Sequence, residues 1–159
     1  MTPLRVANWD DLEEGHAFEP WERSDLSIEL FRAYGEASGD GNPMHTDEEY
    51  ARDLGHPTVF AQGMLIMAFA AKYVTDIAGV GNVRRLWARF AQKTWPGESL
   101  RFTATLGRKY REGDHALADL EIRGTGTDGE EKIRSEATVF CTPAAASPAR
   151  ADRRQEVKP

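Results

Sequence analysis

The sequence predicts an α+β domain in which an antiparallel sheet curls around one long central helix. Helical spacing dominates the first half of the chain, and four strand-like segments separated by turn residues fill the second half. Residues 64–71 are apolar all round, which a surface helix would not tolerate. We therefore expect the helix over residues 63–78 to be enclosed by the sheet.

The first helix is predicted over residues 24–37, where Ile28, Phe31 and Tyr34 recur at helical spacing. Either Ser24 or Ser27 could cap it, and the pattern does not choose between them. Residues 38–43 read Ser-Gly-Asp-Gly-Asn-Pro, a composition that cannot continue a helix. They predict a structured loop.

A second, short helix is predicted after this loop. Residues 46–49, Thr-Asp-Glu-Glu, have the form of a capping box with Thr46 as the cap. Gly55 stands at the stop position, which limits this helix to about two turns.

Strands are predicted over residues 86–90, 100–106, 116–122 and 133–140, and the second and third alternate cleanly. Turn residues at 95–98, 111–114 and 124–129 separate them, so we expect an antiparallel meander. The domain is expected to span residues 1–142. Residues 143–159 lack periodicity and are expected to be a disordered tail.

Composition excludes several classes of function. Twenty basic against 26 acidic residues give a net charge of −6, which disfavours nucleic-acid and anionic-membrane partners. The longest apolar run is too short to span a membrane, and the first residues lack the apolar segment of a secretory signal. Cys141 is the only cysteine, which favours a reducing, cytoplasmic location and a buried, unreactive thiol.

The loop contains the one pair of residues that points to acid–base chemistry. Asp40 and His45, held on one rigid loop, could face a common water, one accepting its proton and the other delivering a proton. The alternative is structural, because Asp in such loops often forms a turn and His before a helix is often a polar contact. Spacing alone leaves both open.

Residues 38–47, Ser-Gly-Asp-Gly-Asn-Pro-Met-His-Thr-Asp, with Ala51 beyond them, resemble the signature of the MaoC-like dehydratases, the (R)-specific enoyl-CoA hydratase (hydratase 2) family. Residues 62–65 and 89–98 resemble two later blocks of that family, in the same order. Two positions depart from it: Gln62 stands where many relatives have His or Pro, and Met44 replaces a commoner aliphatic residue. These departures bear on substrate choice.

The resemblance implies the hot-dog fold, in which a sheet wraps a central helix, and it assigns Asp40 and His45 to catalysis. The pair would activate water for syn addition to a trans-2-enoyl thioester, giving a (3R)-hydroxyacyl thioester, or catalyse the reverse dehydration. The Gly63 backbone N–H, at a helix N-terminus, is the candidate oxyanion donor, or Gly63 is a plain helix-start glycine. Asn42 and Ser38 would hold the loop or position water, or simply form turns.

The resemblance implies no metal and no redox cofactor, only coenzyme A or phosphopantetheine carried by the substrate, and the sequence shows no metal-ligand spacing. Two basic clusters could meet the phosphates of that handle or be solvated strand faces. They are Arg84, Arg85 and Arg89, and then Arg108, Lys109 and Arg111. His16, His56 and His115 are expected to be ordinary turn or surface residues.

A sheet of about five strands wrapped on one helix leaves an edge strand exposed. We therefore expect a homodimer, or a heterodimer with another hot-dog subunit. Two other functions stay open: a non-catalytic partner subunit or acyl-CoA-binding protein, and a hot-dog thioesterase. The thioesterase is disfavoured because residues 64–71 contain no Asp or Glu. Six apolar residues could line an acyl tunnel or belong to the core: Met64, Leu65, Met67, Phe69, Trp87 and Phe90.

Overall fold

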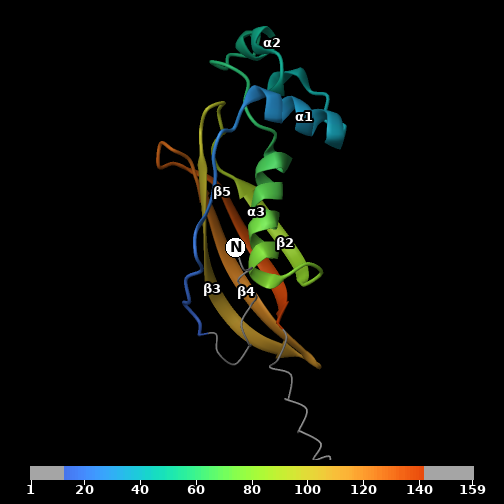
Figure 1. Cartoon of the computed structure of the whole chain (residues 1–159), viewed down its shortest axis with the longest axis vertical. Helices are drawn as coiled ribbons and strands as arrows, with labels where there is room; N and C mark the ends of the chain where they lie inside the picture. The colour runs from blue at the N-terminus through green and yellow to red at the C-terminus, as the bar shows by residue number, and fades with distance from the viewer. Residues whose placement is uncertain (1–12, 142–159) are drawn as a thin grey trace, which may run out of the picture.

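The longest helix, α3 (Gly63–Ala78), lies along one face of an antiparallel sheet (Figure 1). The computed structural model describes residues 13–141, and within them the sheet has five strands. The helix has the bounds that the sequence predicts. The α+β architecture is therefore confirmed.

The strands occur in the sheet in the order β1-β3-β4-β5-β2. Their bounds are β1 (Trp21–Arg23), β2 (Val83–Phe90), β3 (Leu100–Glu112), β4 (His115–Thr125) and β5 (Glu131–Cys141). Strands β3, β4 and β5 form the predicted meander, but β2 pairs with β5, with Phe90 opposite Ile133. The four-strand meander is therefore wrong at β2, because turn residues mark where the chain reverses and not which strands pair. Strand β1, which pairs with β3, was missed because three residues show no alternation.

Helix α1 (Ile28–Ser38) begins four residues later than predicted. Ser27 is the cap, since its Oγ accepts a hydrogen bond from the Leu30 N–H at 3.2 Å. Asp25 has a φ of 58°, which a right-handed helix cannot include, and this excludes Ser24 as the cap.

Helix α2 (Glu48–Asp53) is capped by Asp47 and not by Thr46. The Asp47 carboxylate accepts from the N–H groups of Glu49 and Tyr50 at 3.0 and 3.1 Å. The capping box predicted from Thr46 is thus wrong by one residue, because Thr46 closes the preceding 3-10 turn, Pro43–His45.

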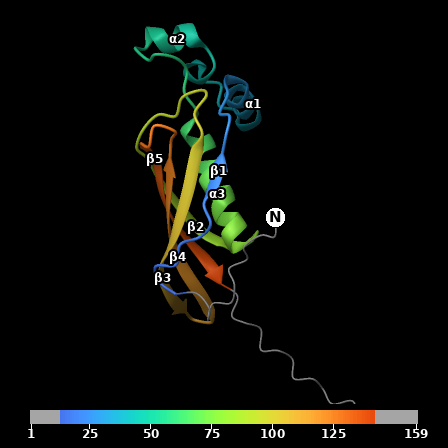
Figure 2. The same cartoon turned by 60° about the vertical axis from the view of Figure 1, so that its left-hand side comes forward.

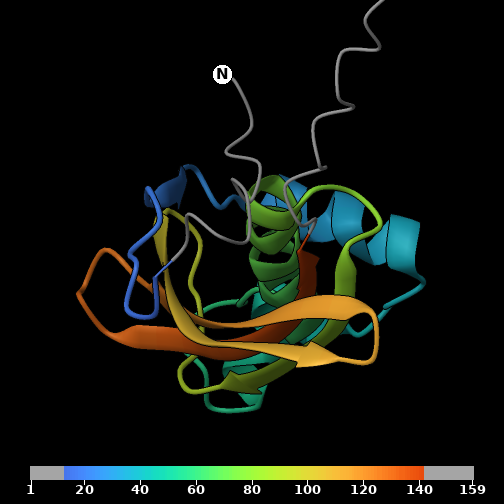
Figure 3. The same cartoon turned by 90° about the horizontal axis from the view of Figure 1, so that it is seen from below.

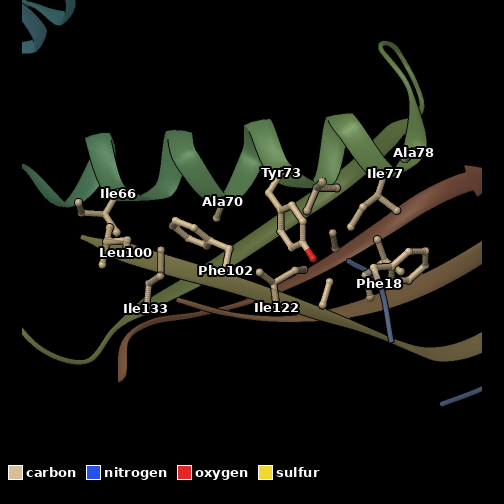
Figure 4. Packing of buried hydrophobic residues seen from close by; sticks show 14 of the residues in the cluster. Phe18, Ile66, Ala70, Tyr73, Ile77, Ala78, Leu100, Phe102, Ile122 and Ile133 are labelled. Atoms are coloured by element: carbon tan, nitrogen blue, oxygen red, sulfur yellow. The ribbon is translucent and has the colours of Figure 1, made fainter. Parts of the chain in front are cut away.

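The core lies between α3 and the sheet (Figure 4). One face of α3 carries Ile66, Ala70, Tyr73 and Ile77, and it packs on buried side chains of the strands. These strand residues include Phe102, Ile122 and Ile133, all at 0% exposure. Each such large apolar side chain contributes about 1.5–3 kcal/mol when fully buried.

The opposite face of α3 is not enclosed, which corrects the expectation drawn from its apolar sequence (Figure 3). Met64 is 57% exposed, and Ala68, one turn later, is also exposed. Trp87 and Phe90 on the edge strand β2 are 42% and 47% exposed, whereas Leu65 is buried and Met67 and Phe69 are half-buried. Hydropathy shows that a surface is apolar, but not whether its own chain covers it.

Cys141 is buried, and burial raises the pKa of its thiol to about 11. None of the helices within residues 13–141 is long and apolar enough to cross a membrane. The predicted tail, residues 143–159, and the first residues of the predicted domain lie outside the described residues.

Candidate active site

The loop that carries Asp40 joins α1 to the 3-10 turn, beyond the N-terminal end of α3 (Figure 2). Three short-range hydrogen bonds between side chains and backbone N–H groups hold it. Ser38 Oγ accepts from the Asp40 N–H at 3.3 Å, Asp40 Oδ1 from the Asn42 N–H at 3.3 Å, and Asn42 Oδ1 from the Met44 N–H at 3.1 Å. Ser38 and Asn42 therefore make the contacts of turn formers, and they limit the conformations open to Asp40.

His45 is buried, at 8% exposure, and its two ring nitrogens have different partners. Nδ1 lies 2.7 Å from the Phe60 carbonyl oxygen, and because a carbonyl only accepts, Nδ1 carries the hydrogen. Nε2 lies 4.0 Å from Asp40 Oδ2. That separation is too long for a direct hydrogen bond, but it lets one small polar molecule contact both groups.

Solvent reaches this pair through Asp40, whose side chain is 39% exposed. Asp40 lines an open depression of about 450 Å³ together with Arg32, Gly35 and Thr46. The arrangement thus combines an enclosed imidazole with a carboxylate that opens to solvent, which suits proton exchange with a reacting molecule.

Gly63 is the first residue of α3, so its N–H has no partner within the helix. It lines a second pocket, of about 280 Å³, with Phe60, Phe90, Lys93 and Lys132. A Cβ on Gly63 would lie 3.3 Å from the Phe90 ring, so glycine keeps this wall open.

Phe60 joins the two parts of the site. Its carbonyl oxygen contacts His45 and its ring packs edge-on against the imidazole at 5.1 Å, while the residue also lines the pocket beside Gly63. Sequence reasoning missed Phe60, because one contact uses a backbone atom, which residue type does not reveal, and the ring contact joins residues 15 positions apart.

Arg84 and Arg85 lie at the start of β2, away from this site. The Asn82 side chain donates to the Ala78 carbonyl at the C-terminal end of α3, whereas Phe90, at the other end of β2, packs beside Gly63. Arg84 pairs with Glu112, and that hydrogen bond raises the pKa of the guanidinium. Arg89 is exposed near the Phe90 end, opposite Arg134. In the second cluster, Arg108 pairs with Asp119 at 3.0 Å.

Two lysines that sequence reasoning missed lie on the pocket beside Gly63. Lys132 is only 2% exposed, and its ammonium donates to Glu98 at 3.0 Å and to Asp128 at 2.6 Å. Burial works to lower the pKa of Lys132, but the two carboxylates outweigh it and the pKa is raised. Lys93 places its ammonium 5.4 Å from the centre of the Phe60 ring. Within residues 13–141 no group of His, Cys, Asp or Glu could hold a metal ion.

A family model described as "MaoC like domain" matches residues 14–121. The chain belongs to the MaoC-like dehydratase family. A relative of this MaoC-like protein, the peroxisomal enoyl-CoA hydratase 2 of Arabidopsis thaliana, is 35% identical over 66 residues. Those residues are 40% of this chain and 21% of the plant enzyme, so the match spans about a fifth of that relative.

Solved structures confirm the predicted hot-dog fold of this MaoC-like protein. The unliganded R-hydratase PhaJ1 of Pseudomonas aeruginosa superposes with a TM-score of 0.75, at 21% identity, over 86% of each chain. A chain of the ChsH1-ChsH2 complex of Mycobacterium tuberculosis gives a TM-score of 0.72, at 16% identity, over 82% of this chain and 98% of that chain. At these identities the similarity establishes the fold.

Proposed function

We propose that this protein is an (R)-specific enoyl-thioester hydratase, which in reverse is a (3R)-hydroxyacyl-thioester dehydratase. The observation that carries the proposal is the placement of His45 Nε2 4.0 Å from Asp40 Oδ2, with Nδ1 engaged by the Phe60 carbonyl. In the neutral ring this leaves Nε2 as an acceptor, close enough to a carboxylate oxygen for one water molecule to bind both. Family membership supports the same reaction class.

In the hydration direction, the water oxygen forms a bond to C3 as the Asp40–His45 pair removes one proton from it. The electron pair of the C2=C3 bond moves toward the thioester carbonyl, giving an enolate. The Asp40–His45 pair then delivers a proton to C2 on the same face, which balances the proton taken from water and completes syn addition. The Gly63 N–H is our candidate to stabilise the enolate oxygen, since it is a free first-turn amide on the pocket wall.

The substrate in this proposal is a trans-2-enoyl group on coenzyme A or on a carrier-protein phosphopantetheine. The chemistry requires no metal and no redox cofactor, because only protons and water are exchanged. Lys93, which lines the pocket, and Arg89, the neighbour of the lining residue Phe90, are both exposed and could meet phosphates of the substrate handle.

A second candidate is that the chain works only with a partner hot-dog subunit. Met64, at 57% exposure, and Ala68 are the exposed apolar residues in the first turns of α3, and they follow Gly63, which packs beside Phe90 of the edge strand β2. An uncovered edge and an apolar face are the features that a second subunit covers, whether another copy or a different chain. One similar structure is a complex of two chains, ChsH1 and ChsH2.

The experiment is to mix purified protein with crotonyl-CoA and with a longer trans-2-enoyl-CoA, and to follow the loss of enoyl-thioester absorbance. We expect an (R)-3-hydroxyacyl product by chiral analysis. Release of free thiol would instead indicate a thioesterase. Absence of reaction from a folded protein, with both substrates, would contradict independent activity and favour the partner-dependent form.

A further inference from the structure

Gln62, the residue before Gly63, is enclosed in the protein at 1% exposure. Its Nε2 donates a hydrogen bond to the Phe31 carbonyl of α1 at 2.9 Å. Because that carbonyl only accepts, the NH₂ side of the amide must face it, and the position of Oε1 is then set. No donor within residues 13–141 reaches Oε1, although the atom is buried.

This arrangement is unfavourable for folding alone. A buried acceptor without a donor loses its hydration and gains nothing in return, and an apolar side chain of similar size avoids that loss. The N-terminus of α3 gains no compensation, because the Gln62 side chain makes no capping hydrogen bond. Folding alone therefore does not account for a glutamine at this position.

Gly35 connects Gln62 to the Asp40 loop. It lies one turn after Phe31 in α1, and a Cβ built on it would stand 3.4 Å from Gln62 Nε2 and 2.8 Å from the Asp40 carbonyl oxygen. The Asp40 backbone and the Gln62 amide therefore both pack closely on the same glycine. Apart from proline, glycine is the residue that destabilises a helix interior most. A glycine inside a helix is therefore a signal in the sequence that some other contact requires it.

We propose that Gln62 is a positioning residue, which holds the Asp40 loop and the Gly63 N–H at a fixed separation. The inference rests on the proposed function, in which the loop acts at C2 and C3 and the Gly63 N–H at the carbonyl oxygen of one thioester. Gln62 is covalently joined to Gly63 and hydrogen-bonded to α1, which ends in the Asp40 loop. Catalysis depends on such separations to within fractions of an ångström.

The test is Gln62→Leu, which keeps a similar volume and removes both the donor and the unpaired acceptor. We expect kcat to fall by about tenfold or more with KM within about twofold, because groups that bind the handle are untouched. We also expect the thermal midpoint to stay the same or rise. A merely structural role would lower the midpoint.

The matched control is Ser135→Ala. Ser135 is also 1% exposed with an unpaired buried oxygen, but it lies within β5. We expect the thermal midpoint of Ser135→Ala to stay the same or rise, as in Gln62→Leu, and its kcat to stay at the wild-type value. If Gln62→Leu does not fold, Gln62→Met, which keeps the side-chain length, carries the same expectation.

A second readout does not need activity. In ¹H–¹⁵N spectra of Gln62→Leu, the amide signals of Asp40 and Asn42 should shift as well as that of the adjacent Gly63. Wild-type kcat in a folded variant, or shifts confined to the immediate neighbours of residue 62, would overturn the positioning role. An inactive wild-type protein would contradict independent hydratase activity, while leaving this spectroscopic result to decide whether Gln62 couples the two elements.

Discussion

The Phe60 carbonyl oxygen lies 2.7 Å from Nδ1 of His45, and this contact decides which ring nitrogen faces Asp40. Phe60 precedes α3 by three residues, whereas His45 ends the 3-10 turn before α2. The chain thus sets the tautomer of His45 with a backbone atom from the segment that leads into the central helix. The proposed acid–base role of His45 therefore depends on how that segment is placed.

Gly35→Ala is expected to lower kcat by up to about 100-fold. The added Cβ would lie 2.8 Å from the Asp40 carbonyl oxygen, so the loop must move. Alanine favours the helix by up to about 1 kcal/mol, so lost helix stability cannot explain a fall in rate. Steady-state kinetics measure the effect, with Gly107→Ala as the control, because its Cβ would stand at an ordinary 3.4 Å from the Asp119 carbonyl. Equal rates in the two variants would contradict this expectation.

Asp47→Ala should lower the free energy of unfolding by about 1 kcal/mol, because two α2 N–H groups lose their acceptor. Thr46→Ala, the neighbour that the sequence pattern favours as the cap, should change it by less than about 0.5 kcal/mol. Urea unfolding of the two variants, with the same dependence of the unfolding free energy on urea concentration, shows whether Asp47 or Thr46 is the cap. A larger loss in Thr46→Ala would show that the cap is wrongly assigned.

Cys141 should resist thiol reagents in the native protein. Burial raises the pKa of its thiol from 9.0 to about 11, so the native thiolate fraction at neutral pH is about 100-fold below that of the unfolded chain. The raised pKa also means that this group's contribution to stability is complete below pH 9.0 and is lost as the pH rises through about 11. Labelling with Ellman's reagent, before and after unfolding, measures the difference. Equal rates in both states would contradict the burial of Cys141.

Local sequence patterns predicted most of the helices and strands. They did not predict the contacts between segments that are far apart in the sequence. The apolar residues of α3 and the alternation of β3 and β4 appear directly in the sequence, because each reflects a local period. The pairing of β2 with β5 is not local, and neither is the exposure of Met64, which depends on what the rest of the chain covers. The left-handed Asp25 moved the start of α1, an exception that residue type alone does not reveal.

The candidate site likewise contains some features that local sequence predicts and others that depend on long-range contacts. The loop that places Asp40 and His45 together is a short segment with strong turn residues, so their proximity followed from the sequence. The contacts of Phe60, Gly35 and Gln62 did not, because they arise where α1, the loop and the start of α3 meet. Arg84 shows the opposite case, since a basic cluster in sequence is neutralised in part by Glu112 from another strand.

In the proposed reaction Asp40 and His45 together activate water, and the most direct test is the hydration rate of Asp40→Asn and His45→Ala with a trans-2-enoyl thioester. Each variant should lose about 10²- to 10⁴-fold in kcat while keeping the wild-type circular dichroism and thermal midpoint. Asp76→Asn, an exposed carboxylate on α3 paired with Lys72, should keep the wild-type rate. Near-normal turnover in either Asp40→Asn or His45→Ala would contradict the account.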